Sequence, residues 1–108
     1  LEATVAIILN SENLEPKQKQ QMLEKAVDVG LSLKDDASRA VTIDGIKDVV
    51  IKTNLSTEDK GTMLIAVGDK VNNVSELSNA EKQKSLGSVL KKGVETQVLS
   101  PAQQQLMQ

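Results

Sequence analysis

A helix-start signal recurs along this chain and constrains its fold more than any other feature of the sequence. The segments that carry it begin at Leu14, Leu55, Leu77 and Leu99. Three of them continue with a serine and have Asp, Glu or Gln three residues later, which is the capping-box pattern of a helix N-terminus: Ser56, Ser78 and Ser100. The fourth has Pro16 in its first turn, where the missing N–H costs nothing. A weaker fifth copy begins at Leu31 and places Ser32 in the capping position.

Apolar residues follow each start at three- and four-residue spacing, the period of an α-helix. The sequence therefore predicts an all-α fold of one-helix repeats of about 22 residues. The expected helices span about 2–10, 15–29, 34–52, 57–72, 79–97 and 101–107. Their short links favour antiparallel neighbours. An antiparallel bundle and a short superhelical array both satisfy this pattern.

The repeat phase also bears on domain organisation. Residues 1–108 are expected to form a single all-helical repeat segment. The residues from Leu1 to Ala6 resemble those that follow Leu23, in the middle of a repeat, and the chain stops nine residues after Leu99. We therefore expect a segment truncated at both ends from a longer protein. Apolar flanks at such ends would allow self-association.

The composition excludes several classes of function. The chain has no His, Cys, Phe, Tyr or Trp, so we expect no zinc site, no thiol or imidazole catalysis, no cofactor and no enzymatic activity. A net charge of −2 with both signs spread along the chain, and the lack of aromatic stacking platforms, argue against nucleic acid as a partner. The longest apolar run, Val5–Leu9, is too short for membrane insertion.

Glycines interrupt several of the expected helices, where each costs about 1 kcal/mol relative to Ala. They are Gly45, Gly68, Gly87 and Gly93. We interpret them as small residues tolerated where helices cross. The alternative is a close approach of two helices, or a helix softened for release from the array.

One amphipathic stripe is the candidate partner-binding surface. It comprises Leu86, Val89, Leu90, Val94 and Val98. A helix with such a stripe either packs into the protein's own core or inserts into the groove of a partner. The spacing of the apolar residues does not choose between these two uses.

Three longer segments resemble a known family. They are Leu1–Asn10, Gly45–Lys52 and Lys60–Lys70. Together with the rest of the chain they resemble an internal stretch of the rickettsial surface cell antigens, heat-stable cytoplasmic antigens without a membrane anchor. The resemblance implies a secreted effector that leaves the bacterial cytoplasm, reaches the host cell cytoplasm, engages host vinculin and favours spread between cells.

In that family, vinculin is bound by amphipathic helices that insert into its head bundle. Leu86, Val89, Leu90 and Val94 fit the apolar pattern of those helices, whereas Gly93 and Gln97 stand where it requires branched apolar residues. The chain is therefore expected to be a scaffold or interaction segment of the effector. The alternative is a structural spacer that binds no partner and positions or masks vinculin-binding helices elsewhere.

Overall fold

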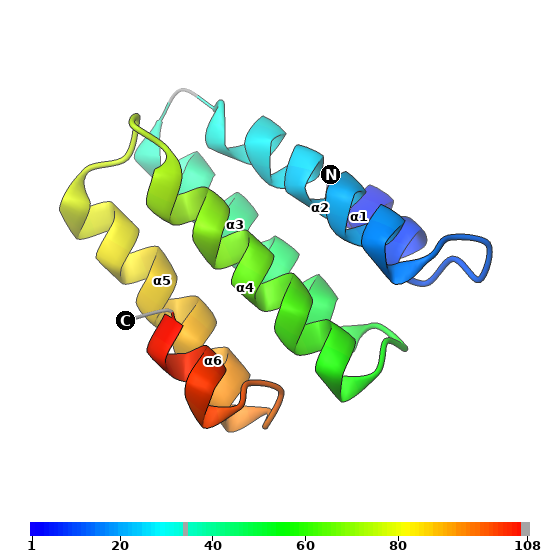
Figure 1. Ribbon diagram of the computed structural model, residues 1–108. Helices are drawn as coiled ribbons and strands as arrows, with labels where there is room; N and C mark the ends of the chain where they lie inside the picture. Colours follow the sequence, from blue (N-terminus) through cyan, green and yellow to red (C-terminus); the bar gives the residue numbers. More distant parts are fainter. Residues whose placement is uncertain (34, 107–108) are drawn as a thin grey trace.

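The computed structural model describes residues 1–33 and 35–106, and all secondary structure in them is helical (Figure 1). The helices are α1 (Glu2–Leu9), α2 (Pro16–Leu31), α3 (Asp36–Lys52), α4 (Thr57–Asn73), α5 (Asn79–Glu95) and α6 (Pro101–Leu106). The predicted all-α fold is therefore confirmed. Lys34 and Met107, which fall in two of the expected helical ranges, lie outside the described residues.

The helices form two layers, with α2, α4 and α6 in front of α1, α3 and α5 (Figure 1). The chain crosses between the layers at each link. From α1 to α4, each helix packs against the next helix and against the next but one, and these pairs supply the substantial helix contacts of the described residues. An array in which contacts reach only near neighbours in sequence is open, and it can be lengthened by adding helices at its ends.

One aliphatic core runs through the array between the layers. Its members come from α1 to α5 and from the links before α5 and α6. The largest fully buried side chains include Leu9, Leu23, Ile46, Met63 and Leu64. Since the chain has no aromatic residue, close packing of these Leu, Ile and Met side chains supplies the apolar burial that holds the helices together.

Serine caps begin the later helices. The backbone N–H of Asp59 donates to Ser56 Oγ at 3.1 Å, and that of Glu81 donates to Ser78 Oγ at 3.2 Å. Ser100 accepts in the same way from the N–H of Gln103, at 3.2 Å, and its own N–H donates to Gln103 Oε1 at 2.9 Å. These bonds satisfy N–H groups that lack a partner within the helix.

The predicted Ser32 cap is wrong. Helix α2 continues to Leu31, and the Ser32 hydroxyl donates to the carbonyl oxygen of Val29 in its last turn. Helix α3 is instead capped by Asp35, whose Oδ1 accepts from the N–H of Ser38 at 2.7 Å. A carboxylate is also favoured there by the helix dipole.

This correction makes the repeat regular. The N-terminal capping residues from α2 onward are Glu15, Asp35, Ser56, Ser78 and Ser100, at spacings of 20, 21, 22 and 22 residues. Helices α2 to α5 have nearly equal lengths of 16 or 17 residues. Successive helices therefore reach across the array to the same extent.

Candidate functional site

The middle of the predicted stripe belongs to the core. Helix α5 packs against both α3 and α4, which places Val89 in the core cluster with 1% of its surface exposed. Leu86 and Leu90 are partly buried and pack against the same cluster. These three side chains are thus used by the array itself.

The far end of the stripe does not continue as one helical face. Val94 is 44% exposed, whereas Val98 is buried and lies beyond the end of α5. The expected helix over 79–97 is too long, because α5 ends at Glu95 and Gln97 has a left-handed φ of 60°. The N–H of Val98 then donates to the carbonyl of Gly93 and that of Gln97 to Val94, which together form a Schellman motif.

The glycine at this helix end is packed tightly. A Cβ added to Gly93 would clash with the side chain of Leu99 and would lie 3.3 Å from Leu64 Cδ1. Close packing, the alternative interpretation of these glycines, is therefore present at Gly93. It is absent at Gly87, where an added Cβ would meet no atom of the described residues within 4 Å.

For the stripe to enter a partner's groove, α5 would have to leave the array. Exposing one buried Val or Leu side chain costs about 1.5–3 kcal/mol. Release of α5 exposes Val89 and also uncovers the core residues of α3 and α4 on which it packs. The stripe of the folded chain thus offers a partner Val94 and only part of Leu86 and Leu90.

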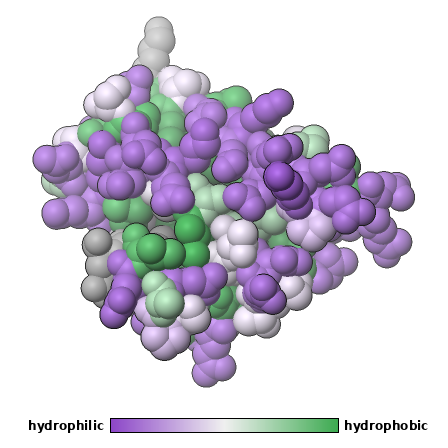
Figure 2. Space-filling model, viewed as in Figure 1, coloured by the Kyte–Doolittle hydropathy of each residue, from purple (hydrophilic) through white to green (hydrophobic). Residues whose placement is uncertain are grey.

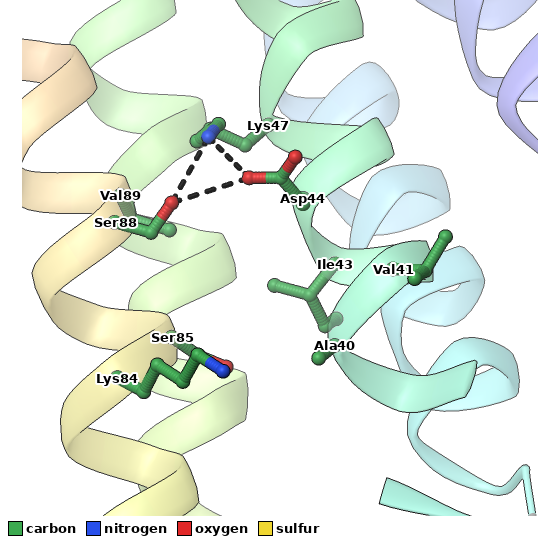
Figure 3. A pocket seen from close by; sticks show the side chains of 9 residues that line it. All are labelled: Ala40, Val41, Ile43, Asp44, Lys47, Lys84, Ser85, Ser88 and Val89. Atoms are coloured by element: carbon green, nitrogen blue, oxygen red, sulfur yellow. Dashed lines mark hydrogen bonds and ion pairs between the residues drawn. The ribbon is translucent and has the colours of Figure 1, made fainter. Parts of the chain in front are cut away.

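A groove of about 280 Å³ lies between α3 and α5 (Figure 3). Ala40, Val41, Ile43 and Val89 supply its apolar lining, and Lys84 extends from α5 toward it. Small side chains, Ala40 on α3 and Ser85 and Ser88 on α5, leave this space between the two helices. The groove is open on the outer side, since Val41 is 69% exposed.

A polar triangle closes one end of this groove (Figure 3). Lys47 is buried on α3 with 7% of its surface exposed, and its ammonium donates to Asp44 Oδ1 and, at 3.0 Å, to Ser88 Oγ on α5. Ser88 Oγ in turn donates to Asp44 Oδ1 at 3.2 Å. The triangle ties α3 to α5 across 41 residues of sequence.

Electrostatics in this triangle favour an ion pair. The hydrogen bond from Lys47 holds the pKa of Asp44 below its ordinary value, and the charge of Lys47, the Ser88 hydroxyl and Lys92 act in the same direction against partial desolvation. Lys47 also lies 3.7 Å from Asp48 Oδ1. An ammonium that faces two carboxylates has no lone pair with which to take a proton from Ser88, so the geometry serves packing.

The contact between Lys47 and Ser88 could not be found from sequence. Both residues lie on helices that were predicted correctly, but nothing in their local spacing says that α3 and α5 are neighbours. The sequence signal is weak. It consists of Lys47, Asp44 and Ser88 at positions that the apolar period leaves on the flanks of their helices.

Within residues 1–33 and 35–106, no group of three or more His, Cys, Asp or Glu side chains converges as a metal site. None of the described helices is both long enough and apolar enough to cross a membrane. Hydrophilic side chains cover most of the face formed by the front layer, with one compact hydrophobic patch beside α6 (Figure 2).

The chain has curated relatives in Rickettsia. It is 83% identical over all 108 residues to the antigenic heat-stable 120 kDa protein of Rickettsia akari, of which it spans 11%. It is 97% identical over 82 residues, 76% of its length, to 8% of the protein of the same name from Rickettsia sibirica subsp. mongolitimonae. Over 86 residues, or 80% of its length, it is 64% identical to 8% of the protein of Rickettsia prowazekii (strain Madrid E).

The chain thus spans about a tenth of the length of the curated relatives it matches. No family model and no solved structure matches it. The resemblance to the rickettsial heat-stable antigens is confirmed over the whole chain.

Proposed function

Because this chain is related over its whole length to the rickettsial heat-stable antigens, we propose that it is a non-enzymatic helical scaffold segment of a secreted effector that engages host vinculin. In this proposal the effector passes from the bacterial cytoplasm to the host cell cytoplasm and promotes spread between cells. Vinculin and secretion enter from the resemblance of the sequence to that family. The helices described here supply the argument for a scaffold.

The observation that carries the scaffold role is the burial of the stripe. Val89 is 1% exposed, and Leu86 and Leu90 pack on the same core. A helix whose apolar face already fills the core of an array has little to offer a groove elsewhere unless it first unfolds. Vinculin-binding helices of the effector are therefore assigned to other parts of the longer protein.

Titration calorimetry of the chain with the vinculin head tests this assignment. We expect no sub-micromolar binding. Val94→Lys and Val41→Lys form a matched pair, because both residues are exposed but only Val94 belongs to the stripe. Sub-micromolar binding that is lost in Val94→Lys and kept in Val41→Lys would place a binding site on α5 and overturn the scaffold role.

A purely structural spacer is the second candidate, and the regular repeat favours it. The capping residues are spaced by 20 to 22 residues, and the helices have nearly equal lengths. Each added helix therefore extends the array by a similar distance. The test replaces this segment, in the full-length Rickettsia akari relative, with an unrelated helical array of equal length. Retained spread between host cells would support a spacer, and lost spread would support a segment with contacts of its own.

A further inference from the structure

Helices α1 and α2, with the residues that flank them, carry most of the exposed large hydrophobic side chains of the described residues. Eight large hydrophobic side chains are exposed among the described residues, and five of them lie before α3: Leu1, Ile7, Met22, Val29 and Leu33. Single exposed hydrophobic residues are normal on a protein surface. Leu33 lines a hollow with Val41 and other residues of α3, whereas Ile7, Met22 and Val29 lie on the two helices at the end of the array. A group of exposed hydrophobic residues is typical of an interaction surface.

Helix α1 is apolar over most of its surface, and Glu2 and Thr4 are its polar residues. Its one charged residue is Glu2, in the first turn. Val5 and Leu9 are fully buried in the core, while Ile7 is 73% exposed. A helix with so few polar residues is typically enclosed on most of its sides, whereas α1 leaves Ala3, Thr4 and Ile7 exposed.

Helix α2 carries two exposed apolar side chains on a different side from the residue that pairs with α4. Asp28 pairs with Lys70 of α4 at 3.1 Å, which marks the flank of α2 that faces its neighbour. Met22 and Val29 are seven residues apart, close to two helical turns, so they share a side. Around the helix they lie about 100–120° from Asp28, and they are 40% and 56% exposed.

The layers explain why this flank is open. Helix α3 has α1 on one side and α5 on the other, and α4 has α2 and α6. Within the described residues, α1 and α2 have a layer neighbour on one side only (Figure 1). The interior helices α3 and α4 each pack against a neighbour on both sides within their layer. Helices α1 and α2 have room for the same kind of contact on their open side.

We propose that a further helix pair of the same polypeptide covers Ile7, Met22 and Val29 in the longer protein and continues the two-layer array. The chain spans 11% of its Rickettsia akari relative, so that polypeptide has ample length to supply such a pair. The occupant needs an apolar face against Val29 and Met22 and no charge opposite α1.

Hydrogen exchange tests this proposal in two proteins: the 108-residue chain, and the full-length Rickettsia akari relative carrying this chain in place of its matching segment. We expect α1 amides to exchange about tenfold more slowly, or slower still, in the full-length protein, because covering α1 suppresses its local opening. Val29→Lys should abolish that extra protection. Val41→Lys, at a residue of similar exposure on α3, should leave it intact.

Two results would overturn the proposal. The first is equal exchange of α1 in both proteins, because the edge would then be uncovered in the longer protein. An equal effect of Val29→Lys and Val41→Lys on that exchange would count in the same way, because the protection would then not depend on this edge. The second is a dimer of the 108-residue chain that Val29→Lys dissociates, together with unchanged exchange in the full-length protein. That result would make a second copy the occupant.

Discussion

The backbone N–H of Val98 donates to the carbonyl oxygen of Gly93 at 3.0 Å and turns the chain from α5 toward α6. This bond needs a left-handed residue between its ends, and Gln97 takes that conformation with φ of 60°. Glycine is the usual residue there, because a Cβ is strained at positive φ. The end of α5 therefore holds a small amount of backbone strain.

Gln97→Gly is expected to stabilise the chain by about 0.5–1 kcal/mol, since glycine removes that strain. Urea unfolding followed by circular dichroism measures the change. Gln83→Gly is the control, because Gln83 is an exposed residue inside α5, where glycine should destabilise by about 1 kcal/mol. Loss of stability in both variants would contradict the assigned helix end.

Removal of a capping hydroxyl is expected to lower the free energy of unfolding. Ser56→Ala and Ser78→Ala should each cost about 1 kcal/mol, because an N–H in the first turn loses its acceptor. Ser32→Ala should change stability by less than about 0.5 kcal/mol, since Ser32 follows α2 and caps no N-terminus. A larger loss at Ser32 than at Ser56 would refute the start assigned to α3.

Two glycines on neighbouring helices should respond in opposite directions to alanine. Gly87→Ala should stabilise by up to about 1 kcal/mol, because α5 gains helix propensity and the new methyl group meets open space. Gly61→Ala should destabilise, because its Cβ would clash with the carbonyl oxygen of Val98. Thermal melts of the two variants give the signs, and a stabilising Gly61→Ala would contradict the packing of the 98–100 link on α4.

Leu64→Ala should cost about 2–5 kcal/mol, because Leu64 is fully buried and the truncation leaves a cavity. Leu86→Ala should cost less, because Leu86 is only partly buried at the edge of the same cluster. Denaturant midpoints of the two variants rank these losses. A greater loss at Leu86 would show that α5 is packed more deeply than the array described here.

Acid should weaken the start of α3. The N–H of Ser38 donates to Asp35 and lowers the pKa of that carboxyl below its ordinary value of 3.8, and the Ser38 hydroxyl acts in the same direction. The ionised carboxylate therefore stabilises the fold above about pH 4, and this contribution disappears as the pH falls through the lower folded pKa. Asp35→Asn keeps an acceptor and should flatten the fall of stability between about pH 5 and pH 2. An unchanged slope would contradict this role of Asp35.

The sequence was a good guide to structure that local residues determine. Helix starts at Ser56, Ser78 and Ser100 depend on side chains three residues away, and the apolar period depends on one helix at a time. Ser32 misled because it stands three residues before Asp35, the spacing of a capping box, whereas α2 continues through Leu31 and Asp35 is itself the cap. The end of α5 was missed because Gln97 stands where glycine gives the usual signal.

Contacts between distant helices could not be predicted in this way. The apolar period says which face of α5 is buried, but it does not say that α3 and α4 cover that face. For the same reason a closed bundle and an open array fitted the sequence pattern equally well. The sequence also gave no sign of the hydrogen bond between Lys47 and Ser88. Leu86, Val89 and Leu90 of the candidate stripe form one apolar face of α5, while Val98 lies beyond the end of that helix. The use of this face in the core emerged only from the packing.

The central claim is that the apolar stripe of α5 packs in the core of the array and does not bind a partner. Hydrogen exchange of the 108-residue chain, with and without excess vinculin head, tests it most directly. The account predicts that amides from Leu86 to Val94 exchange as slowly as those of α4, and that vinculin leaves their rates unchanged. Rapid exchange of α5 in the free chain, or a change in its exchange on adding vinculin, would contradict it.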